Sequence, residues 1–293
     1  MNQPNPNRTS RGKHWGTQPI AVVVDGTEES LRGVEWAAGE AALHKAGVML
    51  VRPKGSVLRR VPGSVIDADV QRAREIIKAH NPDASIEVRT VGGGVKTGLV
   101  PVTLDAHMLV IAAGSEQGKR TRLGAPYAAL LAAKAHCPIV VVPRNDLTAT
   151  HVVVGIDGTE SSEDAIAVAF EEAAARGAVL KAVHTWNDFQ LTTAIAAEAS
   201  LAWDEVETGE KVVLSTRLAG WRDKFPEVDV VEVVTKDSPA RQLAHQSQSA
   251  ALLVVGSHGR GPISGLIFRS TSETLMYASR CPLVVVRNGL RKE

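Results

Sequence analysis

Residues 152–160 read Val-Val-Val-Gly-Ile-Asp-Gly-Thr-Glu, and residues 20–28 read Ile-Ala-Val-Val-Val-Asp-Gly-Thr-Glu. A second pair of matching segments closes the two halves, Cys-Pro-Ile-Val-Val-Val at 137–142 and Cys-Pro-Leu-Val-Val-Val at 281–286. Two copies of one unit are the simplest explanation of both matches. Comparing the copies therefore shows which features each one has kept.

The repeat divides the 293-residue chain into two domains of ordinary size. We predict a first domain over 19–144 and a second over 151–288. Segment 1–18 is polar and lacks an apolar signal segment, so we expect it to be a flexible tail. No apolar run reaches the roughly 20 residues that a membrane span requires, and a cytoplasmic location is expected.

Stretches typical of strands and of helices alternate in each copy, which predicts an α/β fold with a mostly parallel sheet. We expect two tandem doubly wound domains, each a five-stranded sheet flanked by helices. The expected strands are 20–24, 48–51, 86–91, 108–112 and 139–142, then 152–156, 179–183, 228–234, 252–255 and 283–286. The expected helices are 28–46, 67–80 and 126–135, then 162–176, 194–225, 239–247 and 272–279.

Composition excludes several classes of partner. The chain has 33 basic and 32 acidic residues, a balance that argues against nucleic acid or an anionic membrane as the main partner. The two cysteines, Cys137 and Cys281, occupy equivalent repeat positions and are expected to be small buried residues. No His-x-x-x-His or Cys-x-x-Cys pattern occurs, so no zinc site is predicted.

The topology indicates where a ligand would bind. In open α/β sheets the ligand lies beyond the carboxyl ends of the strands, where the strand order reverses. Asp157 and Gly256 end two strands of the second copy, and the glycine-rich stretch after Gly256 leads to three hydroxyl residues at the start of a helix. Glycines and a helix N-terminus suit a phosphate, and Arg260 and Arg269 are available to supply positive charge. An ordinary solvent loop with a serine N-cap explains the same composition equally well.

These residues resemble the tandem-domain universal stress proteins of the ATP-binding subclass, over nearly the whole chain after residue 18. The motif of that subclass is Gly-x2-Gly-x9-Gly-(Ser/Thr), and Gly256, Gly259 and Ser270 match it. Arg269 replaces the third glycine, where it either crowds the phosphates or pairs with them. The resemblance implies a Rossmann-like nucleotide-binding domain that holds ATP, with or without magnesium. The residues implied are Asp157, Gly158, Thr159, Val183, Val255, Gly256, Gly259, Arg260, Arg269, Ser270, Thr271 and Ser272.

The first copy departs further from the pattern. The residues that it keeps are Asp25, Gly26, Thr27, Val51 and Gly114, and they form a weaker candidate site. Ala125 and Pro126 stand where the second copy has Arg269 and Ser270, which removes a hydroxyl and an N–H group. We therefore expect a structural or regulatory role for the first copy.

Two functions follow from these observations. The first is a stress-response regulator or signalling module that binds ATP chiefly in the second domain, with at most weak hydrolysis. The alternative is a scaffold without nucleotide, acting through dimerisation and protein contacts. An adenylyl-transferring enzyme would need a pyrophosphate loop or a His-x-x-His pair, which the chain lacks. The terminal strands 139–142 and 283–286 are short, apolar and at sheet edges, which tend to pair. The resemblance implies that these strands join the two domains, and a homodimer and a protein partner of unknown identity are expected as well.

Overall fold

The computed structural model describes residues 18–54, 63–113, 125–144, 149–186, 203–257 and 270–290. The first half contains β1 (Ile20–Val23), α1 (Glu28–Leu43), β2 (Val48–Lys54), α2 (Gly63–His80), β3 (Ile86–Gly92), η2 (Val95–Leu99), α3 (Val100–Val102), β4 (Met108–Ala112), α4 (Ala125–Ala132) and β5 (Ile139–Val142). The second half contains β6 (Val152–Ile156), η3 (Glu160–Ser162), α5 (Glu163–Arg176), β7 (Leu180–Trp186), α6 (Trp203–Lys224), β8 (Val230–Lys236), α7 (Pro239–Gln246), β9 (Leu252–Gly256), α8 (Thr271–Ala278) and β10 (Leu283–Val286).

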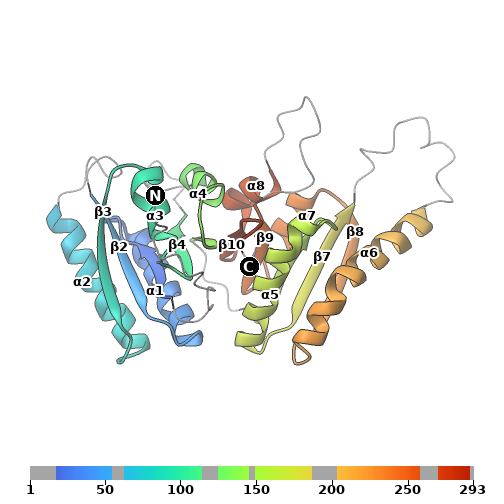
Figure 1. The fold of residues 1–293 in the computed structure, drawn as a ribbon, viewed down its shortest axis with the longest axis horizontal. Helices are drawn as coiled ribbons and strands as arrows, with labels where there is room; N and C mark the ends of the chain where they lie inside the picture. The colour runs from blue at the N-terminus through green and yellow to red at the C-terminus, as the bar shows by residue number, and fades with distance from the viewer. Residues whose placement is uncertain are drawn as a thin grey trace, which may run out of the picture.

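Each half forms a five-stranded parallel sheet, in the order β3-β2-β1-β4-β5 and β8-β7-β6-β9-β10 (Figure 1). The predicted fold class is therefore confirmed. The apolar runs of β1 and β9 are buried because helices cover both faces of the sheet. The strand order reverses between β1 and β4 in the first half, and between β6 and β9 in the second.

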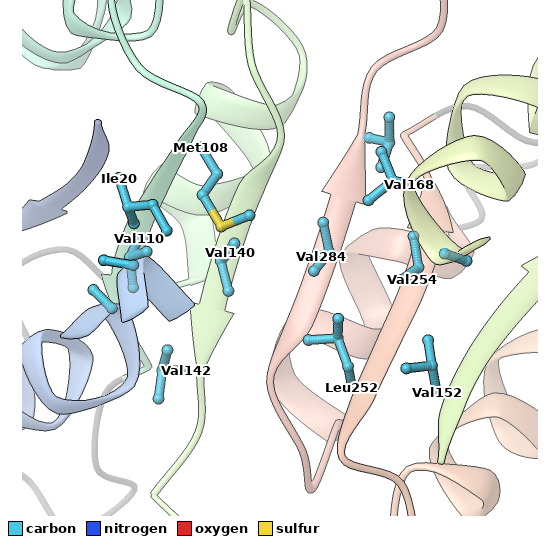
Figure 2. Packing of buried hydrophobic residues seen from close by; sticks show 14 of the residues in the cluster. Ile20, Met108, Val110, Val140, Val142, Val152, Val168, Leu252, Val254 and Val284 are labelled. Carbon is cyan, nitrogen blue, oxygen red and sulfur yellow. The ribbon is translucent and has the colours of Figure 1, made fainter. Parts of the chain in front are cut away.

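The two halves share one continuous ten-stranded sheet, because β5 pairs antiparallel with β10. Val140 lies opposite Val284 at the centre of this pairing, which we call the seam (Figure 2). The prediction that the terminal strands join the two domains is confirmed. Since β5 and β10 occupy each other's edges, the expected homodimer requires a different surface, and it stays a prediction.

Two helix ends show how the repeats differ. In the second half α5 ends at Arg176, as predicted, and Gly177 follows as the C-cap with a left-handed φ of 57°. In the first half the predicted helix 28–46 is too long, because α1 ends at Leu43 and Lys45 carries a positive φ of 52°. Gly47 lies against Ser85, so a side chain at this position would displace the Ser85 hydroxyl.

Helix α6 has 22 residues, against 18 for α2 at the same place in the first half, and it packs on α5. Phe170 of α5 contacts Trp221 and Phe225, with ring centroids 6.2 and 5.7 Å away. The helix was predicted over 194–225; it covers Trp203–Lys224, and the part of the prediction before 203 falls on residues outside the described ranges. Helix α2 starts at Gly63, four residues before the predicted start.

A further helical segment, η2 and α3, was not predicted. It follows β3 directly and buries Val95, Leu99 and Val102 against the sheet. It is preceded by Gly92, Gly93 and Gly94, which are typical of a turn. A helical segment this short is difficult to predict directly after such a run. Pro101 is tolerated because it lies in the first turn of α3, where its missing N–H has no helical partner.

The cysteine prediction is confirmed for both residues. Cys137 and Cys281 are buried and form no disulfide, and burial raises the pKa of the Cys281 thiol to about 12. A thiol held in its neutral form is a weak nucleophile, so this residue serves packing. Among the described residues, no helix has both the length and the apolar character needed to cross a bilayer.

The glycine at 98 is a test of the packing of η2. A Cβ at this position would lie 2.6 Å from the backbone oxygen of Gly92, a contact that no rotamer change relieves. We expect Gly98→Ala to lower the free energy of unfolding by about 1–3 kcal/mol, measured by urea denaturation. The matched control is Gly209→Ala on exposed α6, where a Cβ meets nothing within 4 Å. That variant should gain about 1 kcal/mol from helix propensity, and equal effects in the two variants would contradict the packing argument.

Candidate functional site

The turn that follows β6 is built around the carboxylate of Asp157. Oδ1 accepts hydrogen bonds from the Thr159 backbone N–H at 2.9 Å, from Thr159 Oγ1 at 2.8 Å and from Ser162 Oγ at 2.7 Å. Oδ2 accepts one from Ser161 Oγ at 2.8 Å. Gly158 has a φ of 81°, a conformation that requires glycine or strains another residue. The Asp-Gly-Thr sequence is therefore a rigid turn that leads from the strand into η3 and α5.

These hydrogen bonds control the charge of Asp157. Burial alone would raise the pKa of this carboxyl, but the donors from Ser162, Thr159 and Ser161 outweigh burial and hold the pKa below its usual value of 3.8. Asp157 is therefore ionised at neutral pH. Its negative charge is shared among the turn's own donors, so the turn is stable without a ligand.

The second part of the candidate site lies where β9 ends and α8 begins. Gly256 is the last residue of β9, and Ser257 donates its N–H to Val286 of β10 at 2.8 Å. Ser270 is the N-cap of α8 and accepts a hydrogen bond from the Glu273 N–H at 3.2 Å. Ser272 Oγ lies 3.4 Å from the Ser257 carbonyl oxygen and 3.1 Å from Ser270 Oγ. The start of α8, with Thr271 as its first residue, is thus held against the end of β9.

The sheet brings these two parts to one place. β6 and β9 are hydrogen-bonded neighbours, with Gly155 opposite Val255, so the residues that follow both strands lie at the same edge. This is the position where the strand order of the second half reverses. Such a position is the usual ligand site of a doubly wound sheet. The edge combines a helix N-terminus, which favours anions, with a turn that carries an ionised carboxylate.

The valines of the predicted site lie deep in the sheet. The strand predicted over 179–183 is longer, because β7 continues to Trp186, and Val183 is 1% exposed in the core. Val51 occupies the same position in β2 and is fully buried. Val255 is 3% exposed, one residue before the end of β9. These side chains support the floor of the candidate site.

Part of the predicted site falls on residues that are not described. Gly259, Arg260 and Arg269 of the second copy and Gly114 of the first lie outside the described ranges. The roles predicted for these four residues therefore stay predictions.

The first copy reproduces the turn but has fewer polar donors around it. Asp25 accepts hydrogen bonds from the N–H and the hydroxyl of Thr27, and Gly26 has the same φ of 81° as Gly158. Ser30, the counterpart of Ser162, donates its hydroxyl to the Thr27 carbonyl oxygen at 2.7 Å instead. Helix α4 begins at Ala125, which has no side-chain oxygen to cap a helix or bind an anion.

Helix α6 supports the Asp157 turn through contacts that the sequence did not predict. Arg217 Nε donates to the Gly158 carbonyl oxygen at 3.2 Å, and Arg217 Nη1 lies 3.3 Å from Glu163 Oε1. His184 is fully buried, and its ring nitrogens lie 2.7 Å from the Ile156 carbonyl oxygen and from Glu210. These contacts give His184 a structural role, because they tie β6 and β7 to α6. No pattern in the sequence indicated the partners on α6.

Comparisons with known proteins agree on one family. The sequence profile described as the universal stress protein family matches residues 16–143 and 148–287. The universal stress protein Rv2623 of Mycobacterium tuberculosis is 32% identical over 292 residues, covering 92% of this chain and 97% of the relative. A universal stress protein of Mycolicibacterium smegmatis is 33% identical over 290 residues, covering 92% and 96% of the two chains.

Solved structures share the fold. The crystal structure of a universal stress protein from Archaeoglobus fulgidus superimposes with a TM-score of 0.61 at 19% identity, covering 94% of this chain and 98% of that one. A protein of unknown function from Pseudomonas aeruginosa, PA1789, gives a TM-score of 0.60 at 14% identity, covering 94% of both chains. At these identities the likeness shows the fold alone.

The Ser162 hydroxyl tests the ionic character of the turn. Ser162→Ala removes the hydrogen bond to Asp157 Oδ1 and the one that Ser162 Oγ accepts from the Asp157 N–H at 3.0 Å. We expect a loss of about 1–3 kcal/mol in unfolding free energy at neutral pH. Because the folded pKa of Asp157 is depressed, the carboxylate stabilises the fold above pH 3.8, and this contribution is lost as the pH falls through the folded pKa.

The same variant is compared at neutral and at acid pH. The loss of unfolding free energy caused by Ser162→Ala, measured by urea denaturation, should be smaller in acid. Ser30→Ala is the matched variant in the first copy, and its acceptor is a carbonyl oxygen that does not titrate. Its cost should change little with pH. If both variants show the same pH dependence, the donors around Asp157 do not act through its charge.

Proposed function

The chain belongs to the universal stress protein family, and we propose from this premise that its second repeat binds ATP and acts as a regulatory module. The observation that carries the proposal is the meeting of two structures at one edge of the sheet. One is the Asp157–Thr159 turn after β6, and the other is the N-terminus of α8 beside Ser257. They adjoin the point of strand-order reversal, where doubly wound folds bind their ligands.

Helix α8 is the proposed contact for the phosphates. The first N–H groups of a helix have no partner within the helix, and the helix dipole adds partial positive charge there. Ser270 and Thr271 add hydroxyl groups at the same place, and Ser270 is exposed. An anion of high charge, such as a triphosphate, is the ligand that this end favours. Arg260 and Arg269 are proposed to add charge from the adjoining segment, and magnesium is proposed to accompany the phosphates.

The Asp157 turn is the proposed contact for the nucleoside. Its carboxylate shapes the turn, and Gly158 and Thr159 present backbone and hydroxyl groups at the edge of the sheet. Arg217 fixes the turn from α6, which makes the site rigid before a ligand arrives. A preorganised site loses less entropy on binding. The proposal assigns binding to these residues, and hydrolysis, where it occurs, is slow.

The first repeat is proposed to have a supporting role. It keeps the Asp25 turn but lacks a hydroxyl at the start of α4. One observation favours the alternative of a scaffold without nucleotide. The Asp157 turn satisfies its own carboxylate, so it does not need a ligand for stability. Nucleotide binding separates the two functions.

Calorimetry with ATP and magnesium, on protein stripped of bound nucleotide, tests the proposal. Ser270→Asp keeps an N-cap of equal quality but adds a negative charge where the phosphates are expected. We expect ATP affinity to fall about 10-fold or more from like-charge repulsion, with the melting temperature nearly unchanged. The control Val212→Asp adds the same charge on the exposed outer side of α6, where Val212 is 61% exposed, and should bind ATP normally.

The two repeats are compared with Asp157→Ala and Asp25→Ala. We expect the first change to abolish tight ATP binding and the second to leave it intact. Absence of ATP binding to the folded wild-type protein would refute the proposal and favour the scaffold. If only Asp25→Ala loses ATP binding, the site lies in the first repeat and the proposal is wrong about which repeat binds.

A further inference from the structure

Four charged side chains meet between α1 and α5, at the seam and away from both Asp-Gly-Thr turns. They are Glu40, His44, Glu172 and Arg176, and we call them the charge quartet. His44 Nε2 lies 3.0 Å from Glu40 Oε1 and 3.3 Å from Glu172 Oε1. The Arg176 guanidinium donates to both carboxylates. The carboxylates are almost fully buried, with Glu40 4% and Glu172 2% exposed.

The quartet is made of two equivalent pairs. Glu40 and His44 are four residues apart on α1, as Glu172 and Arg176 are on α5, and each pair member lies 132 residues from its counterpart. The same interval separates Asp25 from Asp157. Each cation therefore contacts the carboxylate of its own helix and that of the other repeat. The repeats differ in one respect: one uses arginine and the other uses histidine.

This difference makes the charge balance depend on a proton. When both buried carboxylates are ionised, they require two positive charges, because an unpaired buried charge is strongly destabilising. Arg176 is always charged, whereas His44 is charged only when its ring binds a second proton. Among the described residues, His107 also lies against His44; it precedes β4, and its ring centroid is 5.5 Å away. A charged His107 would oppose the charge on His44, so the carboxylates must supply the attraction.

Bound metal is a weaker explanation of the same geometry. One ligand atom each from Glu40, His44 and Glu172 lies within 4.8 Å of the others, which is a spacing that a metal ion could use. Arg176, however, already contacts both carboxylates and supplies the positive charge that a metal would bring. The quartet is complete without an ion.

We infer that the charge quartet is a proton-dependent latch between the two repeats, in which His44 is held as an imidazolium and the seam loosens when that proton leaves. The helices that carry the quartet also cover the seam, because α1 contacts β5 and α5 contacts β10 (Figure 1). Deprotonation of His44 would leave two buried carboxylates facing one cation. Their repulsion would act directly across the boundary between the repeats.

The pKa values agree with this geometry. Burial opposes the charge on His44, but hydrogen bonds and attraction to Glu172 and Glu40 raise its pKa from 6.5 to about 10. Burial and the neighbouring Glu40 raise the pKa of Glu172 from 4.5 to about 7. Burial would also raise the pKa of Glu40, but His44 and Arg176 lower it to about 2. Glu40 therefore stays ionised while Glu172 is the carboxyl that takes up a proton.

These shifts set the direction of the pH dependence. A histidine with a raised folded pKa stabilises the fold fully below pH 6.5, and this stability is lost as the pH rises through about 10. Glu172 acts in the same direction, because the folded state binds its proton more tightly between pH 4.5 and about 7. Glu40 acts oppositely, and its contribution is lost only as the pH falls from 4.5 towards about 2. The latch is thus tighter in mild acid than in alkali.

The direct test is an NMR titration of the His44 ring in the full-length wild-type protein. We expect its pKa to be near 10, and Glu172→Gln should lower it because one attracting carboxylate is lost. A His44 pKa near the ordinary 6.5 in the wild-type protein would overturn the inference, whatever the variants do.

Thermal unfolding tests the effect on stability. His44→Gln keeps hydrogen bonding but removes the charge, and we expect it to lower the melting temperature by roughly 5–10 °C at about pH 6. The difference from wild type should nearly vanish at about pH 10.5, where the His44 ring of the wild-type protein is itself mostly neutral. His80→Gln removes an exposed histidine of α2 and is the control for a general effect of histidine loss. A cost of His44→Gln that is the same at both pH values would contradict the latch.

Hydrogen exchange shows whether the effect is local to the seam. In His44→Gln at about pH 7, protection should fall at Leu283 and Val285 of β10, which pair with β5, more than at β8 amides. Equal losses in both strands would assign His44 a general structural role and overturn the proposed latch.

Discussion

The antiparallel pairing of β5 with β10 is the contact on which the rest of the structure depends. Both strands are four residues long and fully buried, and their pairing turns two five-stranded sheets into one. Because equivalent strands pair antiparallel, the copies are related by an approximate twofold rotation. Equivalent residues near the axis must then meet. Glu40 meets Glu172 for this reason, and the charges around them follow from the symmetry.

The sequence predicted the strands well because their signal is local and strong. Continuous β-branched runs such as 139–142 and 152–156 suit strands buried on both faces, and the repeat places equivalent strands in both halves. The failures lie where tertiary packing decides. Gly47 looks like a helix cap in the sequence, but it follows the end of α1 by several residues and lies against Ser85. Segment 95–102 is helical because Val95 and Leu99 cover the sheet, and a run of glycines conceals it.

The position of the candidate site could be predicted from the sequence, but the contacts that hold its residues in place could not. Topology alone places Asp157 and Gly256 at one edge of the sheet, since β6 and β9 are neighbours across the reversal of strand order. The contacts that hold the turn come from α6, through Arg217 and through Glu210 against His184. The angle and register of that helix depend on Phe170 and Trp221, which pack between helices far apart in the sequence. Residue patterns carry no information on such contacts.

Duplication gave both repeats the same turn and the same buried glutamate. The repeats differ in the side chains that surround these two features. Ser162 donates to Asp157, whereas Ser30 donates to a backbone carbonyl, so the second turn holds its charge with more donors. At the seam, His44 in the first repeat stands where the second repeat has Arg176. The contacts with both glutamates are kept, but the positive charge of His44 depends on protonation of its ring. A buried ionic network is a costly way to gain stability, because both partners lose their hydration. The contacts run between helices of different repeats, so the network favours the one register that brings both pairs together.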